Sequence, residues 1–123
     1  MKESPIFTKT CDLLAWLIPL TMKFPREQRF VLARSVQQAA FATQEHLVRA
    51  GHSKDYAQTL VALDEVVIQL GLIRFYLRLS QQMAYLDVKQ YEYVSDKLTE
   101  IGRLLEGWRK TCKLSVTTLA TSA

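Results

Sequence analysis

Apolar side chains recur every three or four positions along most of this chain, and this spacing constrains the fold more than any other feature. Between residues 88 and 112, seven of them form one stripe: Tyr91, Val94, Leu98, Ile101, Leu105, Trp108 and Cys112. Alternating steps of three and four match the turn of an α-helix and turn one face toward a core. With only 4 glycines and 3 prolines in 123 residues, the chain lacks the frequent turns of a β-sandwich or barrel. The sequence therefore predicts an all-α fold.

Breaks and capping residues divide the chain into four expected helices. They span about residues 5–22, 25–50, 54–84 and 88–110. We expect Pro25 to start the second helix and a left-handed Gly51 to stop it. Ser53 is the expected cap of the third helix, and Asp87 with Gln90 forms a capping box for the fourth. Because the connections are short, consecutive helices should be antiparallel, as in an up-down-up-down four-helix bundle.

The chain is long enough for one domain, and its composition is that of a globular protein. Hydrophobic residues make up 49% and charged residues 23% of the sequence, which excludes disorder for most of it. We expect one bundle domain over residues 1–112 and a flexible C-terminal tail over residues 113–123. The longest apolar stretch, Leu13 to Met22, is interrupted by Pro19 and is too short to span a membrane. We therefore expect a cytoplasmic protein without a signal peptide or membrane segment.

The third expected helix carries two apolar stripes instead of one. The first stripe comprises Leu63, Val66, Leu70, Ile73 and Leu77, and the second comprises Val61, Ile68, Leu72, Phe75 and Leu79. At 100° per residue their centres lie roughly 160° apart, so one bundle core cannot bury both. Each of the five large apolar side chains that stays in water loses about 1.5–3 kcal/mol of the favourable free energy of burial. We expect the second stripe to be an oligomer interface; the alternative is a helix that lies at the centre of a monomer.

The sequence contains no arrangement of residues that suggests an enzyme. No Glu-x-x-His pair, metal-ligand spacing or glycine-rich phosphate loop is present. The only cysteines, Cys11 and Cys112, are expected to be reduced thiols that do not form a bridge. His46 and His52 are expected at the surface. We therefore expect no catalytic residue, no metal and no cofactor.

Basic residues are the remaining functional signal. Arg74 and Arg78 lie one turn apart between the two stripes, and no acidic residue occurs three or four positions from either. Further basic residues, at the first inter-helix turn and on the polar face of the second helix, are Lys23, Arg26, Arg29 and Arg34. Each of these side chains is a candidate for contacting phosphate without sequence preference.

The basic residues near the C-terminus have a simpler interpretation. Arg103, Arg109, Lys110 and Lys113 have acidic neighbours on the same expected helix. We expect Glu106 to pair with Lys110, and Arg103 with Glu100 or Glu106. This group is therefore interpreted as a solvated face with ion pairs.

Several segments together resemble a known family. They are Phe24–Phe30 with the following Gln38–Ala40, then Leu72–Leu79, Gln90–Glu92 and Ile101–Trp108. These segments resemble the accessory variability determinant (Avd) of diversity-generating retroelements. That group is similar to the wider four-helix-bundle family that includes the rRNA intervening-sequence proteins. The likeness covers about residues 4–110.

The resemblance implies a homopentameric barrel of four-helix bundles that binds RNA or DNA without marked sequence preference. It also implies a reverse transcriptase partner that copies a template RNA with errors, in the process called retrohoming, and no catalytic centre in the accessory protein. The chain's formal charge of +4 would become about +20 in five copies. By position, Arg74 and Arg78 are the first candidates for contacting RNA or the polymerase, followed by Arg26 and Arg29.

Two other interpretations remain open at this point. One is a general RNA-associated bundle without a reverse transcriptase partner. The other is a protein-interaction scaffold whose charge serves only solvation. Measuring nucleic-acid binding and identifying the partner would distinguish these two interpretations from the retroelement accessory protein.

Overall fold

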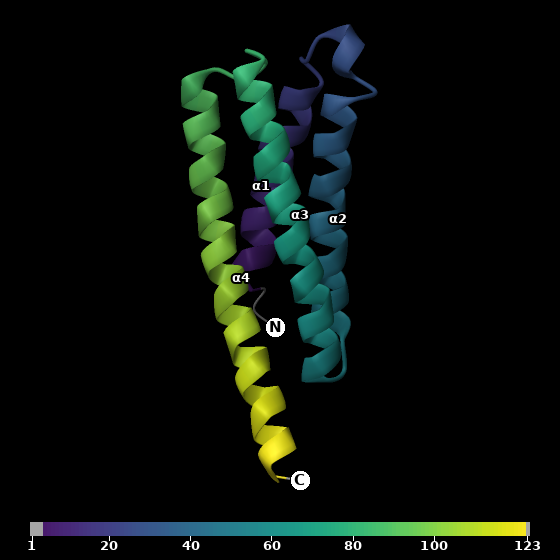
Figure 1. The fold of residues 1–123 in the computed structure, drawn as a ribbon, viewed down its shortest axis with the longest axis vertical. Helices are drawn as coiled ribbons and strands as arrows, with labels where there is room; N and C mark the ends of the chain where they lie inside the picture. Colours follow the sequence, from purple (N-terminus) through teal and green to yellow (C-terminus); the bar gives the residue numbers. More distant parts are fainter. Residues whose placement is uncertain (1–3, 123) are drawn as a thin grey trace.

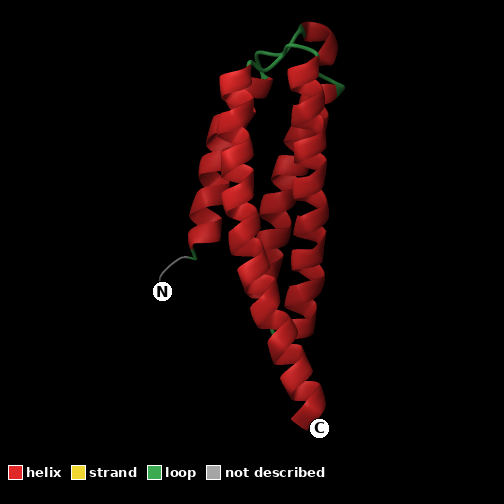
Figure 2. Cartoon of the chain, turned by 60° about the vertical axis from the view of Figure 1, so that its left-hand side comes forward, coloured by secondary structure: helices red, strands yellow, loops and turns green. Residues whose placement is uncertain are grey.

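The computed structural model describes residues 4–122 as four α-helices and one short 3₁₀ turn. The elements are α1 (Pro5–Thr21), η1 (Arg26–Gln28), α2 (Leu32–His52), α3 (Tyr56–Gln82) and α4 (Val88–Ser122). The four helices lie side by side along the long axis, and α4 extends past the others at its C-terminal end (Figure 1). The α1–α2 and α3–α4 connections lie at one end of the molecule, and the α2–α3 connection lies at the other. Helices and loops account for the whole described chain, which holds no strand (Figure 2).

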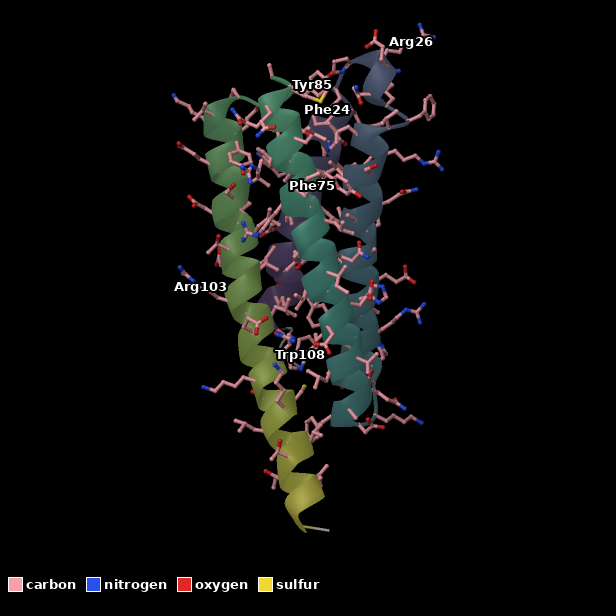
Figure 3. The ribbon with its side chains drawn as sticks, in the orientation of Figure 1. Phe24, Arg26, Phe75, Tyr85, Arg103 and Trp108 are labelled. Carbon is pink, nitrogen blue, oxygen red and sulfur yellow. The ribbon has the colours of Figure 1, made fainter. Side chains whose placement is uncertain are left out.

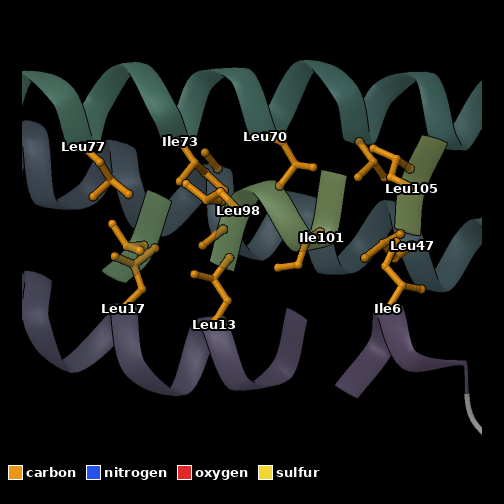
Figure 4. Close-up of a cluster of buried hydrophobic side chains, with 14 of the residues drawn as sticks. Ile6, Leu13, Leu17, Leu47, Leu70, Ile73, Leu77, Leu98, Ile101 and Leu105 are labelled. Atoms are coloured by element: carbon orange, nitrogen blue, oxygen red, sulfur yellow. The ribbon is translucent and has the colours of Figure 1, made fainter. Parts of the chain in front are cut away.

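The expected buried faces are confirmed, and they meet in one core (Figure 4). On α3, all five residues of the first stripe are buried. On α4, the stripe is buried at Val94, Leu98, Ile101, Leu105 and Cys112, and half-buried at Tyr91 and Trp108. These side chains pack against α1 and α2 residues such as Leu13, Leu17 and Leu47. A single bundle core therefore explains the first stripe of α3 and the stripe of α4.

The second helix begins later than we predicted, at Leu32 and not at Pro25. Pro25 has extended backbone angles (φ −51°, ψ 146°), and the next three residues form the 3₁₀ turn. Phe24 explains this difference, because its side chain is buried in a small second cluster with Leu32 and Ala33. Its ring lies 5.5 Å from that of Tyr85 in the α3–α4 connection (Figure 3). Burial of Phe24 therefore holds the chain in a turn where local propensity favours a helix.

The role that we predicted for Gly51 is wrong. Gly51 lies within α2, and no described glycine has a positive φ. The helix ends instead at Ser53, whose backbone is extended (φ −69°, ψ 143°). A Cβ atom at position 51 would lie 3.2 Å from the ring of Phe7. Glycine at this position permits close contact between α1 and α2.

The caps of the last two helices differ in how well the sequence predicted them. Asp55, and not Ser53, caps α3: its Oδ1 accepts a hydrogen bond from the backbone N–H of Gln58 at 2.8 Å. The capping box of α4 is confirmed, because the Gln90 N–H donates to Asp87 Oδ1 at 2.7 Å and the Asp87 N–H donates to Gln90 Oε1 at 3.0 Å. Residues 113–122, which we expected in a flexible tail, continue α4 as helix, while residue 123 lies outside the described residues.

Two further expectations concern membranes and thiols. Within residues 4–122, no helix is both long and apolar enough to cross a bilayer. Cys11 is exposed and Cys112 is buried, and both are free thiols. Burial raises the pKa of the Cys112 thiol.

Candidate nucleic-acid and subunit interface

Arg74 and Arg78 border a shallow groove between α3 and α4. Both side chains are exposed. Together with Phe75 and Tyr91 they line a hollow of about 300 Å³. Arg74 donates a hydrogen bond from Nη2 to Thr99 Oγ1 on α4 at 3.2 Å. Within residues 4–122, neither arginine forms an ion pair, so both guanidinium groups are available to an anion.

The groove continues along α3 and α4 because two glycines face it. Gly71 and Gly102 line a second hollow of about 550 Å³ with Arg74 and Arg103. A Cβ atom at either glycine would have no other atom within 4 Å, so both glycines face open space. Arg103 projects outward from α4 in Figure 3.

Arg103 does not form the ion pairs that the sequence analysis expected for it. We expected it to pair with Glu100 or Glu106, but Glu100 pairs with Lys9 on α1 at 3.1 Å. The carboxylate of Glu106 binds Arg109. In the described part of the chain, Arg103 has no carboxylate partner. The neighbouring Gly102 was the sequence signal that could have indicated an open groove at this point.

Arg109 forms ion pairs on two sides, and one of them was not predicted. Its Nε and Nη2 atoms donate to Asp64 Oδ1 on α3 at 3.0 and 2.8 Å, while Nη1 donates to Glu106 at 2.7 and 2.8 Å. The hydrogen bond with Asp64 is the main reason that the pKa of Arg109 is raised above its usual value. The predicted pair of Glu106 with Lys110 is therefore replaced by Glu106 with Arg109. Sequence spacing could not identify Asp64, because it lies 45 residues away.

The second apolar stripe of α3 remains largely in water in the single chain. Val61 is 72% exposed, Ile68 56% and Phe75 60%, and Leu72 is also exposed. Leu79 differs, because it is half-buried against the cluster that holds Phe24. Phe75 also lines the groove of Arg74 and Arg78, so the apolar stripe and the basic groove adjoin.

The other predicted basic residues lie apart from this groove. Lys23, Arg26 and Arg29 are exposed on the turn before α2, and Arg34 is exposed on the first turn of α2. Arg26 points away from the bundle at the end that carries the α1–α2 connection (Figure 3). In residues 4–122, none of the four forms an ion pair. The predicted basic residues therefore form two surfaces, one in the α3–α4 groove and one at the end of the bundle.

The end of the bundle where α2 and α3 connect carries a further hollow, lined by charged residues and histidines. A hollow of about 700 Å³ there is lined by Glu45, His46, Arg49 and His52, among others. Glu45 and Arg49 form an ion pair at 2.9 Å, and the hydrogen bond from Arg49 lowers the pKa of Glu45. His52 Nδ1 lies 3.0 Å from the carbonyl oxygen of Val48. No group of three or more potential metal ligands occurs among the residues that the structure describes.

These features define a four-helix bundle with a basic groove and an exposed apolar stripe on its exterior. The chain matches the bAvd-like family over residues 6–112 and therefore belongs to that family. Avd-like proteins are accessory proteins that are not known to be catalytic. No curated protein sequence matches the chain.

A solved structure supports the assignment of the fold. It is the 1.70 Å crystal structure of a protein of unknown function from the S23 ribosomal protein family of Bacteroides thetaiotaomicron VPI-5482. The two chains superimpose with a TM-score of 0.81 at 21% sequence identity, over 89% of this chain and 99% of the other. At that identity, the likeness establishes a shared fold.

Proposed function

We propose that this chain is the accessory protein of a diversity-generating retroelement. In this role it assembles as a homopentameric barrel of up-down-up-down bundles in the cytoplasm and binds RNA or DNA through its basic surface. It partners the reverse transcriptase during template-RNA-directed mutagenic cDNA synthesis, and it performs no catalysis itself. Membership of the bAvd-like family supports the association with a retroelement reverse transcriptase.

One observation carries the nucleic-acid part of this proposal: the α3–α4 groove brings together arginines that lack carboxylate partners in the described chain. Arg74 and Arg103 line the same hollow, and Arg78 lies one turn along α3 from Arg74. Guanidinium groups donate several hydrogen bonds in a plane and match phosphate geometry. Contacts of this kind hold a nucleic-acid backbone without reading its sequence.

The exposed apolar stripe supports the proposed assembly. A contiguous exposed apolar surface that includes Ile68 and Phe75 is typical of a protein–protein interface. Burying it between copies would arrange the adjoining arginine grooves around a ring and multiply their positive charge. In the proposed mechanism, this ring holds structured RNA against the polymerase while primed cDNA synthesis begins.

The experiment that tests the function combines two measurements on the purified chain. The first is binding to labelled RNA at low and moderate salt, and the second is co-purification with the reverse transcriptase of the proposed retroelement. Salt-sensitive RNA binding together with a stable polymerase complex is the expected result. RNA binding without the polymerase would favour a general RNA-associated bundle, and absence of RNA binding even at low salt would favour a protein-interaction scaffold.

A further inference from the structure

Phe30, in the turn before α2, has the most exposed large apolar side chain among the described residues. It is 80% exposed, and its neighbours Met22 and Val31 are 67% and 60% exposed. The core does not use this ring, and Phe30 also lies outside the second stripe of α3. Three exposed large apolar side chains in one connection are more than the single scattered residue that is ordinary on a protein surface, and such a group is typical of an interaction surface.

The turn that carries Phe30 is held firmly on both sides. Phe24 and Leu32 are buried in the second cluster, 3% and 5% exposed. Between them, backbone hydrogen bonds run from Gln28 N–H to the Pro25 carbonyl at 2.8 Å and from Val31 N–H to the Gln28 carbonyl at 3.2 Å. Because both ends of the turn are packed and its backbone is bonded, Phe30 is presented outward in a fixed place.

The surroundings of Phe30 are strongly basic. Between residues 13 and 44 the sequence has four basic residues, Lys23, Arg26, Arg29 and Arg34, and a single acidic one, Glu27. Within the described chain, none of the four basic side chains is neutralised by an ion pair. The α1–α2 connection therefore carries an excess of positive charge that attracts anions, and Phe30 lies next to Arg29 within it, while the α3–α4 connection at the same end contributes the carboxylate of Asp87.

We propose that Phe30 stacks on an unpaired base of single-stranded RNA or DNA while Lys23, Arg26 and Arg29 contact the adjacent phosphates. Aromatic rings flanked by basic side chains bind single strands in this way, because every base has a flat face. A duplex hides those faces, so the surface discriminates single strands from duplexes. The inference rests on the proposed nucleic-acid binding and adds which form of nucleic acid is bound and where.

Charge favours a nucleic acid over other occupants of this surface. Two copies of this turn packed against each other would place like charges in contact, which disfavours that arrangement, and contact of the turn with a different face of a second copy is tested below by the oligomer mass. Nucleic acid supplies both the negative charge and the flat apolar face that Phe30 and the basic residues match.

The test compares Phe30→Ala with the native chain in fluorescence anisotropy on a short labelled oligothymidine and on an abasic oligomer of equal length. We expect the variant to bind the oligothymidine about 5- to 150-fold more weakly. Its binding to the abasic oligomer and the salt slope on that oligomer should equal those of the native chain, since phosphate contacts are retained. The matched control is Phe41→Ala, which removes a ring that is 56% exposed on α2, outside this turn.

The other possible outcomes show whether the stacking inference fails alone or together with the proposed function. Equal affinity of Phe30→Ala and the native chain for the oligothymidine overturns the stacking assignment and leaves the proposed function standing. An equal loss on the abasic oligomer also overturns it, because no base is then involved. A lower oligomer mass for Phe30→Ala would identify Phe30 as a subunit contact and overturn the inference. If the native chain binds no nucleic acid, the proposed function fails together with the inference.

Discussion

Arg109 on α4 donates two hydrogen bonds to one carboxylate oxygen of Asp64 on α3, from Nε at 3.0 Å and from Nη2 at 2.8 Å. The remaining nitrogen, Nη1, contacts both oxygens of Glu106 on its own helix. The guanidinium side chain is only 17% exposed, whereas those of the two carboxylates are 52% and 59% exposed. Arg109 therefore links α3 to α4 close to the open groove, which is lined by Glu106 among other residues.

Breaking this link should lower stability modestly. We expect Asp64→Asn to reduce the free energy of unfolding by about 1 kcal/mol, because the carboxylate is half-exposed and water screens it. Urea unfolding followed by circular dichroism measures the change. Arg49→Gln, in the exposed pair with Glu45, is the matched control and should change stability by less than about 0.5 kcal/mol. Equal effects of the two substitutions would contradict a structural role for the inter-helix pair.

Removing the groove arginines should weaken nucleic-acid binding. We expect Arg74→Ala with Arg78→Ala to lower RNA affinity and to reduce the slope of log K against log salt by about 1.4–1.8, as two lost phosphate contacts predict. The oligomer mass should stay unchanged, because the substitutions leave the apolar stripe intact. Arg49→Ala is the control, since this arginine is already paired with Glu45. Unchanged RNA binding in the double variant would show that the groove is not the binding surface.

A charge on the second stripe should dissociate the oligomer. Ile68→Glu and Phe75→Glu each place a carboxylate where we propose that a neighbouring copy packs, and desolvating it there is costly. Light scattering coupled to size-exclusion chromatography should give a mass near five chains for the native protein and 14.1 kDa for the variants. Phe41→Glu, at an exposed position on α2, should leave the native mass unchanged. A native mass of one chain would refute the interface.

The two phenylalanines of the first connection should differ sharply in their effect on stability. Phe24→Ala removes a buried ring and should lower the free energy of unfolding by about 3 kcal/mol. Phe30→Ala removes an exposed ring and should change it by less than about 0.5 kcal/mol. Thermal or urea unfolding of the two variants measures this difference. A large destabilisation by Phe30→Ala would mean that its ring packs against the protein in solution.

Cys112 should make the protein sensitive to alkaline pH. Its pKa is raised in the folded state, so the folded protein opposes the loss of the thiol proton more than the unfolded chain does. The free energy of unfolding should therefore fall as pH rises above about 8.5, the ordinary pKa of a cysteine, and it should fall less steeply in Cys112→Ala. Under native conditions, an alkylating reagent should modify the exposed Cys11 and reach Cys112 only after unfolding. Rapid alkylation of Cys112 in the native protein would contradict its burial.

The relation between sequence and fold is clearest in the helices. The core faces of α3 and α4 were predicted correctly because the 3.6-residue period of a helix is a local property. The capping box of Asp87 and Gln90 was also predicted, since both partners lie within four residues. The start of α2 was not, because burial of Phe24 against Tyr85 depends on a segment about 60 residues away.

The order of residues along the chain is enough to specify four helices with one shared core and a second apolar stripe on α3. Which charges are paired depends on how the helices pack against each other. Arg109 is paired with Asp64 across two helices, whereas Arg103 borders the groove without a carboxylate partner in the described chain, although both belong to the same basic group in the sequence. The tertiary structure also decided the role of Gly51, which allows Phe7 to approach α2. Helical periods and caps depend on residues a few positions apart, whereas ion pairs and close contacts between helices depend on the packing of segments that are distant in the sequence.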